Sequence, residues 1–415
     1  MTFTIEPLIL ALTGPAALKY LSIPVIATLI GWVTNWLAIK LTFWPTEFIG
    51  HPPYLGWQGI VPSKVEKMSS IVVDRILSKL GTLEEFFREM EPEKIGQHVA
   101  EEVVEHIEEY TDEIMIERNA VLWENLPTLI KQKFYHRAHK QIPKIIENLV
   151  EDFSRHIEEL VDPKSMIVKQ ATQERDLMTR VFQECGKKEL KFVIASGLYF
   201  GFPFGIIQML VWIYFPEYWV LPAFGFAVGY LTNWIALNFI FRPLKPVNFF
   251  GFKIQGLFLK RQVQVAEVFS RIVTQEMMTV ELIVKEMMTG EHAFRTRSLI
   301  KKHLKPLIEG GAVKALAQIT VGPSGYVDLK RSIEEKAYRL TTETVHDPDF
   351  NHERGEVVER LFRRRMEALT PDEFQDLLRP AFQEDEWILI LVGALLGLAA
   401  GVSQWLFIFG GSLLN

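Results

Sequence analysis

The stretch Gly31-Trp-Val-Thr-Asn-Trp36 decides how this chain is organised, because it recurs as Gly229-Tyr-Leu-Thr-Asn-Trp234. Each copy lies inside a long apolar run and places an amide side chain where a lipid-facing sequence avoids one. About 20 consecutive apolar residues are enough to cross the hydrocarbon core of a bilayer. The recurrence therefore predicts a duplicated protein that is embedded in a membrane.

The composition indicates a mixture of membrane spans and charged helical regions. Of the 415 residues, 48% are hydrophobic and 23% are charged, a combination that is unusual for a soluble globular domain. The net charge of -6 argues against nucleic acid as a partner. A single cysteine, Cys185, excludes an intramolecular disulfide and a cysteine-based metal site. The first residues lack the basic stretch of a cleaved signal peptide, so the first span is expected to stay as an anchor.

Four charge-free apolar segments predict transmembrane helices, and two long charged regions between them predict water-exposed helical arms. In the first arm the apolar residues recur at helical spacing. They are Val99, Val103, Ile107, Tyr110 and Ile114, followed by Ile145, Leu149, Phe153, Ile157 and Leu160. Pro92, Pro127, Pro143 and Pro163 are expected to mark helix starts or breaks.

The two halves of the chain match at fixed offsets. Asn35 and Asn233 lie 198 positions apart, and the glycine ladders Gly197/Gly201/Gly205 and Gly393/Gly397/Gly401 lie 196 positions apart. The expected fold class is an all-α integral membrane protein with two tandem parallel repeats. The predicted domains are repeat 1 at 1–216 (span 20–43, helical arm 46–191, span 192–215) and repeat 2 at 217–415 (span 218–241, helical arm 244–386, span 387–409).

The orientation follows from the positive charges that flank the spans. Lysines and arginines cluster on the arm side of the second and third spans, whereas the predicted hairpin tip between them carries only Glu217. The positive-inside rule then places both arms in the cytoplasm and both termini on the outer side.

Three landmarks carry a resemblance to a known family. They are the Gly-aromatic-x-Thr-Asn-Trp-x-Ala run, the Gln58-Gly59 pair that recurs as Gln255-Gly256, and the run from Ala381 to Glu386 before a glycine-rich final span. With these landmarks the chain resembles the YheB-like bacterial membrane proteins, the domain-of-unknown-function family numbered 445, over nearly its whole length. The resemblance implies a multi-pass protein of the bacterial inner membrane. It implies no activity, and therefore no catalytic or binding residue.

Asn35 and Asn233 are the main intramembrane candidates, because a buried amide must find a partner in hydrocarbon. They could hydrogen-bond each other across the axis between the repeats, or form a polar site for a headgroup, ion or solute. A helix break near the interface, with the amides facing water, is a third interpretation. Gln208 and Gln404 follow the glycine ladders and either bond a neighbouring helix or line a pore. The candidate polar intramembrane residues are Thr34, Asn35, Trp36, Thr232, Asn233, Trp234, Gln208 and Gln404.

Aromatic and basic residues beside the spans are candidates for contact with lipid headgroups. A lysine near the end of a span can extend its ammonium to the interface. Arg363-Arg364-Arg365 could also meet anionic lipid, but Glu359 and Glu367 lie at ion-pair spacing and favour a solvated helix face. The candidate interfacial residues are Lys40, Trp57, Lys64, Phe250, Lys260 and Arg261.

Signals for catalysis or a cofactor are weak. His136 and His139 share a helix face, but the surrounding lysines and Arg137 would repel a metal cation. Gly322-Pro-Ser324-Gly has no strand–turn–helix setting and is expected to be a turn. The sequence therefore predicts no enzyme, no metal and no cofactor.

The leading hypothesis is a non-enzymatic membrane protein whose cytoplasmic arms engage membrane lipids, a second copy or an envelope protein, in envelope organisation or lipid handling. The alternative is a transporter or channel with a polar site between the repeats at the middle of the membrane. Contact between the arms, the oligomeric state and the ligand do not follow from the sequence.

Overall fold

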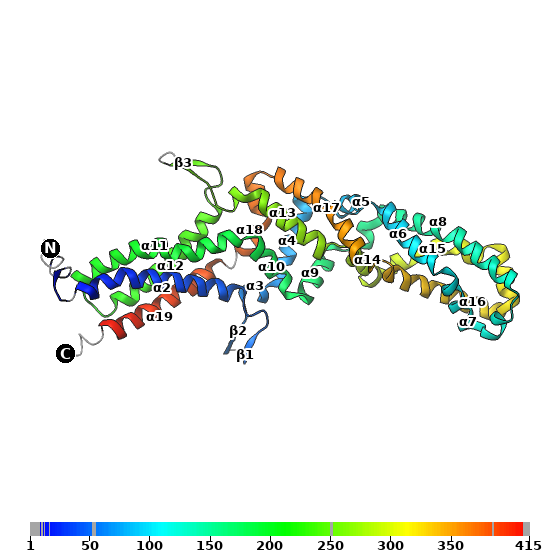
Figure 1. The fold of residues 1–415 in the computed structure, drawn as a ribbon, viewed down its shortest axis with the longest axis horizontal. Helices are drawn as coiled ribbons and strands as arrows, with labels where there is room; N and C mark the ends of the chain where they lie inside the picture. The colour runs from blue at the N-terminus through cyan, green and yellow to red at the C-terminus, as the bar shows by residue number, and fades with distance from the viewer. Residues whose placement is uncertain are drawn as a thin grey trace. The chain divides into compact units, whose positions relative to one another are not determined.

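A computed structural model of the chain describes residues 9, 11, 13–15, 17–51, 55–249, 252–383 and 386–409. Within these ranges the protein is almost entirely helical (Figure 1). Four of the described helices are long and apolar enough to cross a membrane, at Ala17–Phe43, Lys187–Tyr214, Val220–Phe241 and Glu386–Ile408. The predicted all-α class and the four predicted spans are confirmed.

The chain forms two compact units, and each unit takes segments from both halves of the sequence. Unit 1 contains residues 1–75, 171–269 and 366–415, and unit 2 contains residues 76–170 and 270–365. The boundaries fall inside four helices, which are α4 (Val65–Lys79), α9 (Pro163–Gln173), α13 (Gln262–Ile272) and α17 (Pro348–Ala368). The predicted repeat boundaries describe the order of the sequence, and these spatial units do not test them.

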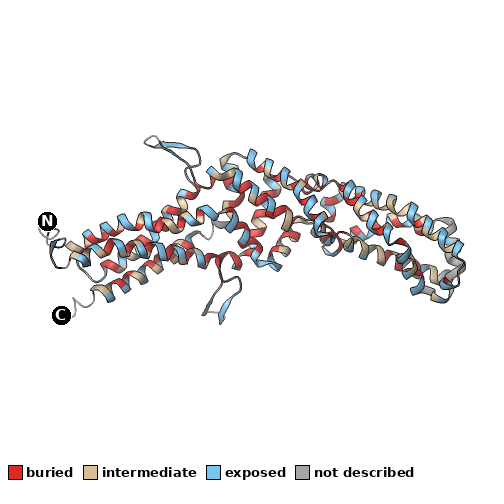
Figure 2. Ribbon diagram, viewed as in Figure 1, coloured by how far each residue is buried: buried red, intermediate tan, exposed pale blue. Residues whose placement is uncertain are grey.

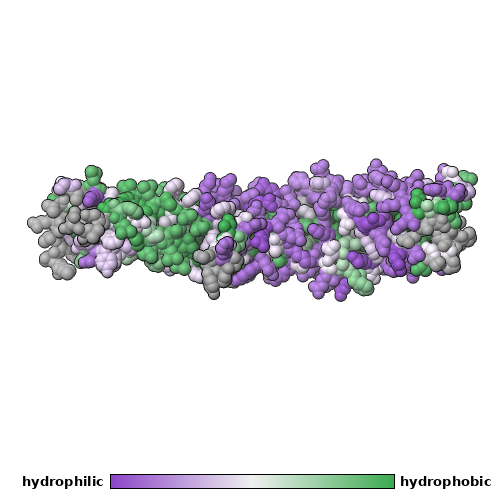
Figure 3. Space-filling model, turned by 90° about the horizontal axis from the view of Figure 1, so that it is seen from below, coloured by the Kyte–Doolittle hydropathy of each residue, from purple (hydrophilic) through white to green (hydrophobic). Residues whose placement is uncertain are grey.

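Unit 1 is built around the four apolar helices, on which hydrophobic residues gather at the surface (Figure 3). Helix α2 (Ala17–Phe43) packs along α11 (Lys187–Tyr214), and α12 (Val220–Phe241) packs along α19 (Glu386–Gln404). Two shorter contacts, of α11 with α12 and of α2 with α19, complete the bundle. The unit also contains α3 (Ile60–Ser63), α10 (Arg175–Cys185), α18 (Pro371–Gln383), the 3-10 helix η1 (Leu259–Arg261) and the π-helix η3 (Trp405–Phe409).

Glycines permit the close packing of these helix pairs, because their backbones approach within contact distance. A Cβ atom placed on Gly197 would lie 2.3 Å from the carbonyl oxygen of Gly31, and one placed on Gly229 would lie 2.3 Å from that of Gly393. Each predicted glycine ladder therefore faces the span that carries the Thr-Asn-Trp triplet of its own half.

Two short hairpins follow the first and third spans, where the sequence predicts only interfacial loops. Strand β1 (Ile49–His51) pairs antiparallel with β2 (Leu55–Trp57), and β3 (Val247–Phe249) pairs antiparallel with β4 (Phe252–Ile254). Each strand has three residues, which is too short for the alternation of apolar and polar residues that reveals a strand in sequence.

Unit 2 consists of helices from both arms, so the two arms pack against each other. The first arm supplies α5 (Leu83–Glu89), α6 (Pro92–Glu105), α7 (Ile107–Glu124) and α8 (Thr128–Leu160). The second arm supplies η2 (Val273–Met277), α14 (Val280–Thr289), α15 (Ala293–Glu309) and α16 (Gly311–Glu343). Helix α8 contacts α6 and α15, and α16 contacts α7, α14 and α15. Buried residues recur in stripes along the helices, as their amphipathic sequences require (Figure 2).

Prolines and capping residues set many of the helix boundaries in the arms. Pro92 and Pro163 open α6 and α9, and Pro127 precedes α8, as the sequence predicts. Thr82 and Glu85 form a capping box at the start of α5. The expected break at Pro143 is wrong, because this residue lies inside helix α8, whose kink falls at His156 instead. Apolar residues on both sides of Pro143 pack into unit 2, and this packing outweighs the loss of one backbone hydrogen bond.

Candidate functional site

The amide side chains of the two triplets are completely buried in unit 1, and each bonds the glycine-rich helix of its own half. Asn35 Nδ2 donates to the carbonyl oxygen of Val193 (2.9 Å) and to Ser196 Oγ (3.2 Å) on α11. Asn233 Nδ2 donates to the carbonyl oxygen of Leu389 (3.2 Å) on α19. The expected mutual contact of the two amides is therefore replaced by two separate contacts with helix backbones.

The hydroxyl groups and rings beside the amides have different surroundings. Thr34 and Thr232 are buried, and their hydroxyls donate to the carbonyl oxygens of Gly31 and Gly229 in the preceding turn. Trp36 and Trp234 are 44% and 48% exposed. Because the helices carrying them are apolar, these rings face outward to the lipid and do not line a polar site.

The amides and the glutamines do not form one site. Gln208 and Gln404 are buried, but Gln208 lies 12 residues beyond Ser196 on α11, about 18 Å along the helix axis. Asn35 Oδ1, Asn233 Oδ1 and Gln404 Nε2 have no hydrogen-bond partner among the described residues. The structure thus places the intramembrane candidates at separate depths of the bundle.

Replacing the amides with leucine is expected to weaken helix packing by a modest amount. Interhelical hydrogen bonds in membranes contribute about 1 kcal/mol, so Asn35→Leu and Asn233→Leu should each lower the free energy of unfolding by about 1 kcal/mol. Asn35→Leu should cost more, because Asn35 donates to two acceptors and Asn233 to one. Denaturation in mild detergent measures this loss.

Asn238→Leu is the matched control for this pair. The Asn238 amide donates only to the carbonyl oxygen of Trp234, in its own helix, at 2.8 Å. Its replacement should change stability by no more than a few tenths of a kcal/mol. Equal losses in all three variants would contradict a packing role for Asn35 and Asn233.

The candidate interfacial residues occupy varied environments in unit 1. The Lys40 ammonium lies 5.2 Å from the ring centre of Trp36 and 5.5 Å from that of Trp44, an arrangement suited to a lysine at the edge of the hydrocarbon. Trp57 Nε1 donates to the carbonyl oxygen of Leu41 at 3.2 Å, which ties β2 to the end of α2. Lys64 follows α3, and Phe250 lies outside the described residues.

Two basic candidates after β4 are held by protein groups. Lys260 Nζ donates to the carbonyl oxygen of Lys253 at 3.2 Å. Arg261 Nη1 donates to both carboxylate oxygens of Glu189, at 2.9 and 2.7 Å, and the Glu189 side chain is only 4% exposed. The charge of Arg261 is therefore balanced inside the protein.

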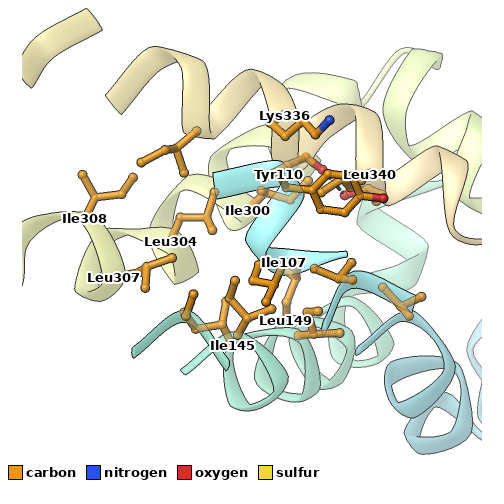
Figure 4. Close-up of a pocket in the computed structure, with 18 of the residues that line it drawn as sticks. Ile107, Tyr110, Ile145, Leu149, Ile300, Leu304, Leu307, Ile308, Lys336 and Leu340 are labelled. Carbon is orange, nitrogen blue, oxygen red and sulfur yellow. Dashed lines mark hydrogen bonds between the residues drawn. The ribbon is translucent and has the colours of Figure 1, made fainter. Parts of the chain in front are cut away.

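Unit 2 contains an apolar cavity of about 230 Å³ that is partly open to the surface. Its walls come from α6, α7 and α8 of the first arm and from α14, α15 and α16 of the second arm. Figure 4 shows Ile107, Ile145 and Leu149 on one side and Ile300, Leu304 and Leu340 on the other. The predicted stripe of the first arm thus lines this cavity, since Val99, Val103, Ile107, Tyr110, Ile114, Ile145, Leu149 and Phe153 all contribute to it.

Sequence reasoning missed the half of the cavity that the second arm supplies. Ile300, Leu304 and Ile308 recur every four residues on α15 and are all buried. This helical spacing is the signal that could have identified them.

A few polar groups lie at the edge of the cavity. The Lys336 ammonium lies 4.3 Å from the ring centre of Tyr110 and is paired with Glu113. Burial raises the pKa of Tyr110, and Glu343 and Glu109 raise it further, so its hydroxyl stays protonated. The hydrogen bond from Lys336 lowers the pKa of Glu113. Arg137 also lines the cavity and bonds Gln141 at 3.3 Å. The described lining residues include no carboxylate and no imidazole.

The comparisons with known proteins point to bacterial membrane proteins. No model of a known protein family matches the chain, and no solved structure matches it. The chain is 26% identical to a UPF0754 membrane protein of Staphylococcus epidermidis over 156 residues, 37% of this chain and 38% of that protein. It is 28% identical to UPF0754 membrane proteins of Staphylococcus aureus strains JH9 and Newman over 86 residues, 20% of this chain and 23% of theirs.

The chain thus spans less than two fifths of the length of the curated relatives that it matches. These distant relatives are described as membrane proteins. The four apolar helices of this chain independently indicate a membrane protein as well. Together they support a place for this chain in a bacterial family of membrane proteins, and the shared description assigns no activity to it.

Proposed function

We propose that this chain is a non-enzymatic multi-pass protein of the bacterial inner membrane, and that its paired arms bind the acyl chain of a membrane lipid in lipid handling or envelope organisation. The observation that carries the proposal is the apolar cavity of about 230 Å³ inside unit 2. The resemblance of the sequence to the YheB-like proteins agrees with the proposed location.

The chemistry of the cavity favours hydrocarbon over water. A buried water needs two to four polar partners, whereas an apolar cavity of about 150 Å³ stays dry and accepts benzene. The cavity here is larger and its walls are aliphatic and aromatic side chains over most of their area. An acyl chain would bury apolar surface at about 25 cal/mol per Å². The described lining holds two cations and no carboxylate or imidazole, which supports a binding role over catalysis.

The polar exterior of unit 2 explains why an acyl chain would have to be held in the apolar cavity. On the face that Figure 3 shows, hydrophilic residues cover most of the surface outside the four apolar helices. Amphipathic helices that expose charge and enclose a cavity are suited to holding hydrocarbon in contact with water. Both arms contribute walls, so the cavity exists only when the arms are paired.

Equivalent contacts in the two halves support the proposed parallel duplication. Asn35 bonds Val193, and Asn233, 198 positions later, bonds Leu389, 196 positions after Val193. Gly31 faces Gly197 in the first half as Gly229 faces Gly393 in the second. Two spans per half give both halves the same orientation, and the juxtamembrane lysines and arginines favour cytoplasmic arms with both termini outside.

Filling the cavity is expected to prevent lipid binding in unit 2 without unfolding the protein. The Ala138 side chain lines the cavity, so the ring in Ala138→Phe would occupy the space of the ligand. The full-length protein, extracted in mild detergent and measured by native mass spectrometry, should retain lipid in near-stoichiometric amount. The variant's affinity for phosphatidylcholine, a lipid without net charge, should be at least about tenfold weaker, which corresponds to about 1.4 kcal/mol of binding free energy.

Val121→Phe is the control, because Val121 is 74% exposed on α7 and the substitution adds similar bulk outside the cavity. It should bind phosphatidylcholine as the unmodified chain does. Phosphatidylcholine binding by Ala138→Phe at the original affinity, or no retained lipid in the unmodified protein, would overturn the proposal.

The alternative of a transporter or channel rests on one observation, the buried amide oxygens of Asn35 and Asn233, which lack donors among the residues that the structure covers. A bound cation or solute could satisfy them. In proteoliposomes this alternative predicts that Asn35→Leu and Asn233→Leu abolish flux while leaving the unfolding transition unchanged.

A further inference from the structure

A second pocket, lined by polar and basic side chains, lies in unit 1 where the third span ends. It has a volume of about 660 Å³ and is widely open to the surface. Helix α12 and the segment after it contribute Asn238, Phe239 and Arg242, and α18 contributes Gln375 and Arg379. None of these five residues belongs to the candidate sites described above.

Arg379 is held in a fixed position by the protein. Its guanidinium carbon lies 5.2 Å from the ring centre of Phe241. With the Gln375 amide oriented to satisfy both of its groups, the amide oxygen accepts from Arg379 Nη1 at 3.0 Å and the nitrogen donates to the carbonyl oxygen of Phe241 at 2.9 Å. The Arg379 side chain is only 13% exposed. The pocket is therefore preorganised around a buried guanidinium.

Among the described residues, the side chains at the pocket carry an excess of one positive charge. Glu386 lies 3.6 Å from Arg379 Nε and is the only carboxylate that pairs with either arginine among the described residues. Arg379 Nε has no hydrogen-bond partner in the described part of the chain, and the Arg242 side chain is exposed. Two guanidinium groups against one carboxylate favour an anion, and the planar fork of arginine matches a phosphate group.

The position of the pocket favours a lipid over a soluble anion. Arg242 directly follows the last residue of a membrane span, at the depth where headgroups flank the hydrocarbon. Phe239, which also lines the pocket, is 42% exposed on the apolar surface of α12. The pocket thus combines donors for a phosphate with an apolar wall toward the bilayer, which suits the headgroup and upper acyl chain of a phospholipid.

We propose that the pocket formed by Asn238, Arg242, Gln375 and Arg379 binds the phosphate headgroup of an anionic phospholipid. The site is independent of the acyl-chain cavity in unit 2. The first half does not repeat its arginines, because the matching positions there are Lys40, Trp44, Thr179 and Gln183.

The test measures headgroup selectivity in the Ala138→Phe background, so that lipid in the unit 2 cavity does not contribute. The full-length protein is titrated in mild detergent with phosphatidylglycerol and, separately, with phosphatidylcholine of the same acyl chains, and bound lipids are counted by native mass spectrometry. One phosphatidylglycerol should bind per chain with about tenfold preference. Arg242→Gln should remove most of this preference, since one charge-assisted contact accounts for roughly a tenfold change in affinity.

Lys188→Gln is the matched control, because it removes one exposed positive charge near the start of a span outside the pocket. It should keep the preference. Equal loss in both variants, indicating diffuse attraction to charge, would overturn the proposal, as would the absence of any preference in the starting protein. Displacement of the lipid by millimolar inorganic phosphate would identify a soluble anion as the ligand and would also overturn it.

Discussion

Gly197→Ala is expected to separate α2 from α11 and to lower the free energy of unfolding by about 3 kcal/mol or more, the upper range for overpacking a close contact. The added Cβ would lie 2.3 Å from the carbonyl oxygen of Gly31 and 2.6 Å from the backbone nitrogen of Trp32. Both neighbours are backbone atoms, so no side-chain rotation can relieve the overlap. The helices must move apart.

Separation of the helices would also break a hydrogen bond near the substituted residue. Asn35 Nδ2 donates to Ser196 Oγ, and Ser196 directly precedes Gly197, so a shift of α11 leaves a buried amide nitrogen without its acceptors. That additional loss of about 1 kcal/mol makes the expected effect larger than overpacking alone. Loss of the cooperative unfolding transition in detergent, monitored by near-ultraviolet circular dichroism, measures the combined effect.

Gly201→Ala is the control on the same helix face, one turn further along α11. Its Cβ would lie 3.0 Å from Thr28 Cα and 3.1 Å from the carbonyl oxygen of Ala27, so a shift of a few tenths of an ångström is enough. A loss of about 1 kcal/mol or less is expected. If the two variants unfold alike, close backbone approach at Gly197 is not what holds the pair of helices together.

The sequence predicts best those features that depend on local composition and periodicity. All four spans were recognised from charge-free apolar runs, because the bilayer imposes a minimum length on such runs. The stripe from Val99 to Phe153 was recognised from helical spacing, and its members line the interior of unit 2. The helix starts at Pro92 and Pro163 were predicted correctly. The first N–H groups of a helix have no partner within the helix, so proline, which lacks an N–H, is tolerated there.

The partners of these elements could not be predicted, because they depend on contacts between distant residues. A stripe shows which face of a helix is buried but does not show what covers it, so the pairing of the first arm with α15 and α16 stayed undetermined. The amides illustrate the same limit. Asn35 could be identified as a buried group in need of a partner, but Val193 lies 158 residues away. At Pro143, packing overrode the local preference.

Glu189→Leu is expected to destabilise unit 1 by about 3–5 kcal/mol, the cost of leaving one partner of a buried ion pair without its counter-charge. The Glu189 side chain is 4% exposed and that of Arg261 is 19% exposed. The carboxylate accepts two hydrogen bonds from Arg261 Nη1. Without it, the guanidinium would have to remain buried and unpaired or move toward solvent and disturb the start of α11 and the short helix η1.

Glu159→Leu is the control for an exposed pair. Glu159 bonds Arg295 at 3.2 Å in unit 2, with side chains 64% and 56% exposed. Water already screens these charges, so a change of at most about 1 kcal/mol is expected. Denaturation of each variant in mild detergent gives the comparison.

The double variant Glu189→Leu/Arg261→Met separates two explanations of the expected loss. If the damage arises from an unpaired buried cation, removal of both charges should restore most of the stability, because an apolar pair of similar volume often replaces a buried ion pair without loss. If the geometry of the pair itself fixes η1 against α11, the double variant should stay as unstable as Glu189→Leu. A stable double variant that still binds lipid would further show that neither Arg261 nor Glu189 is needed for headgroup binding, which then depends on other cations such as the exposed Arg242.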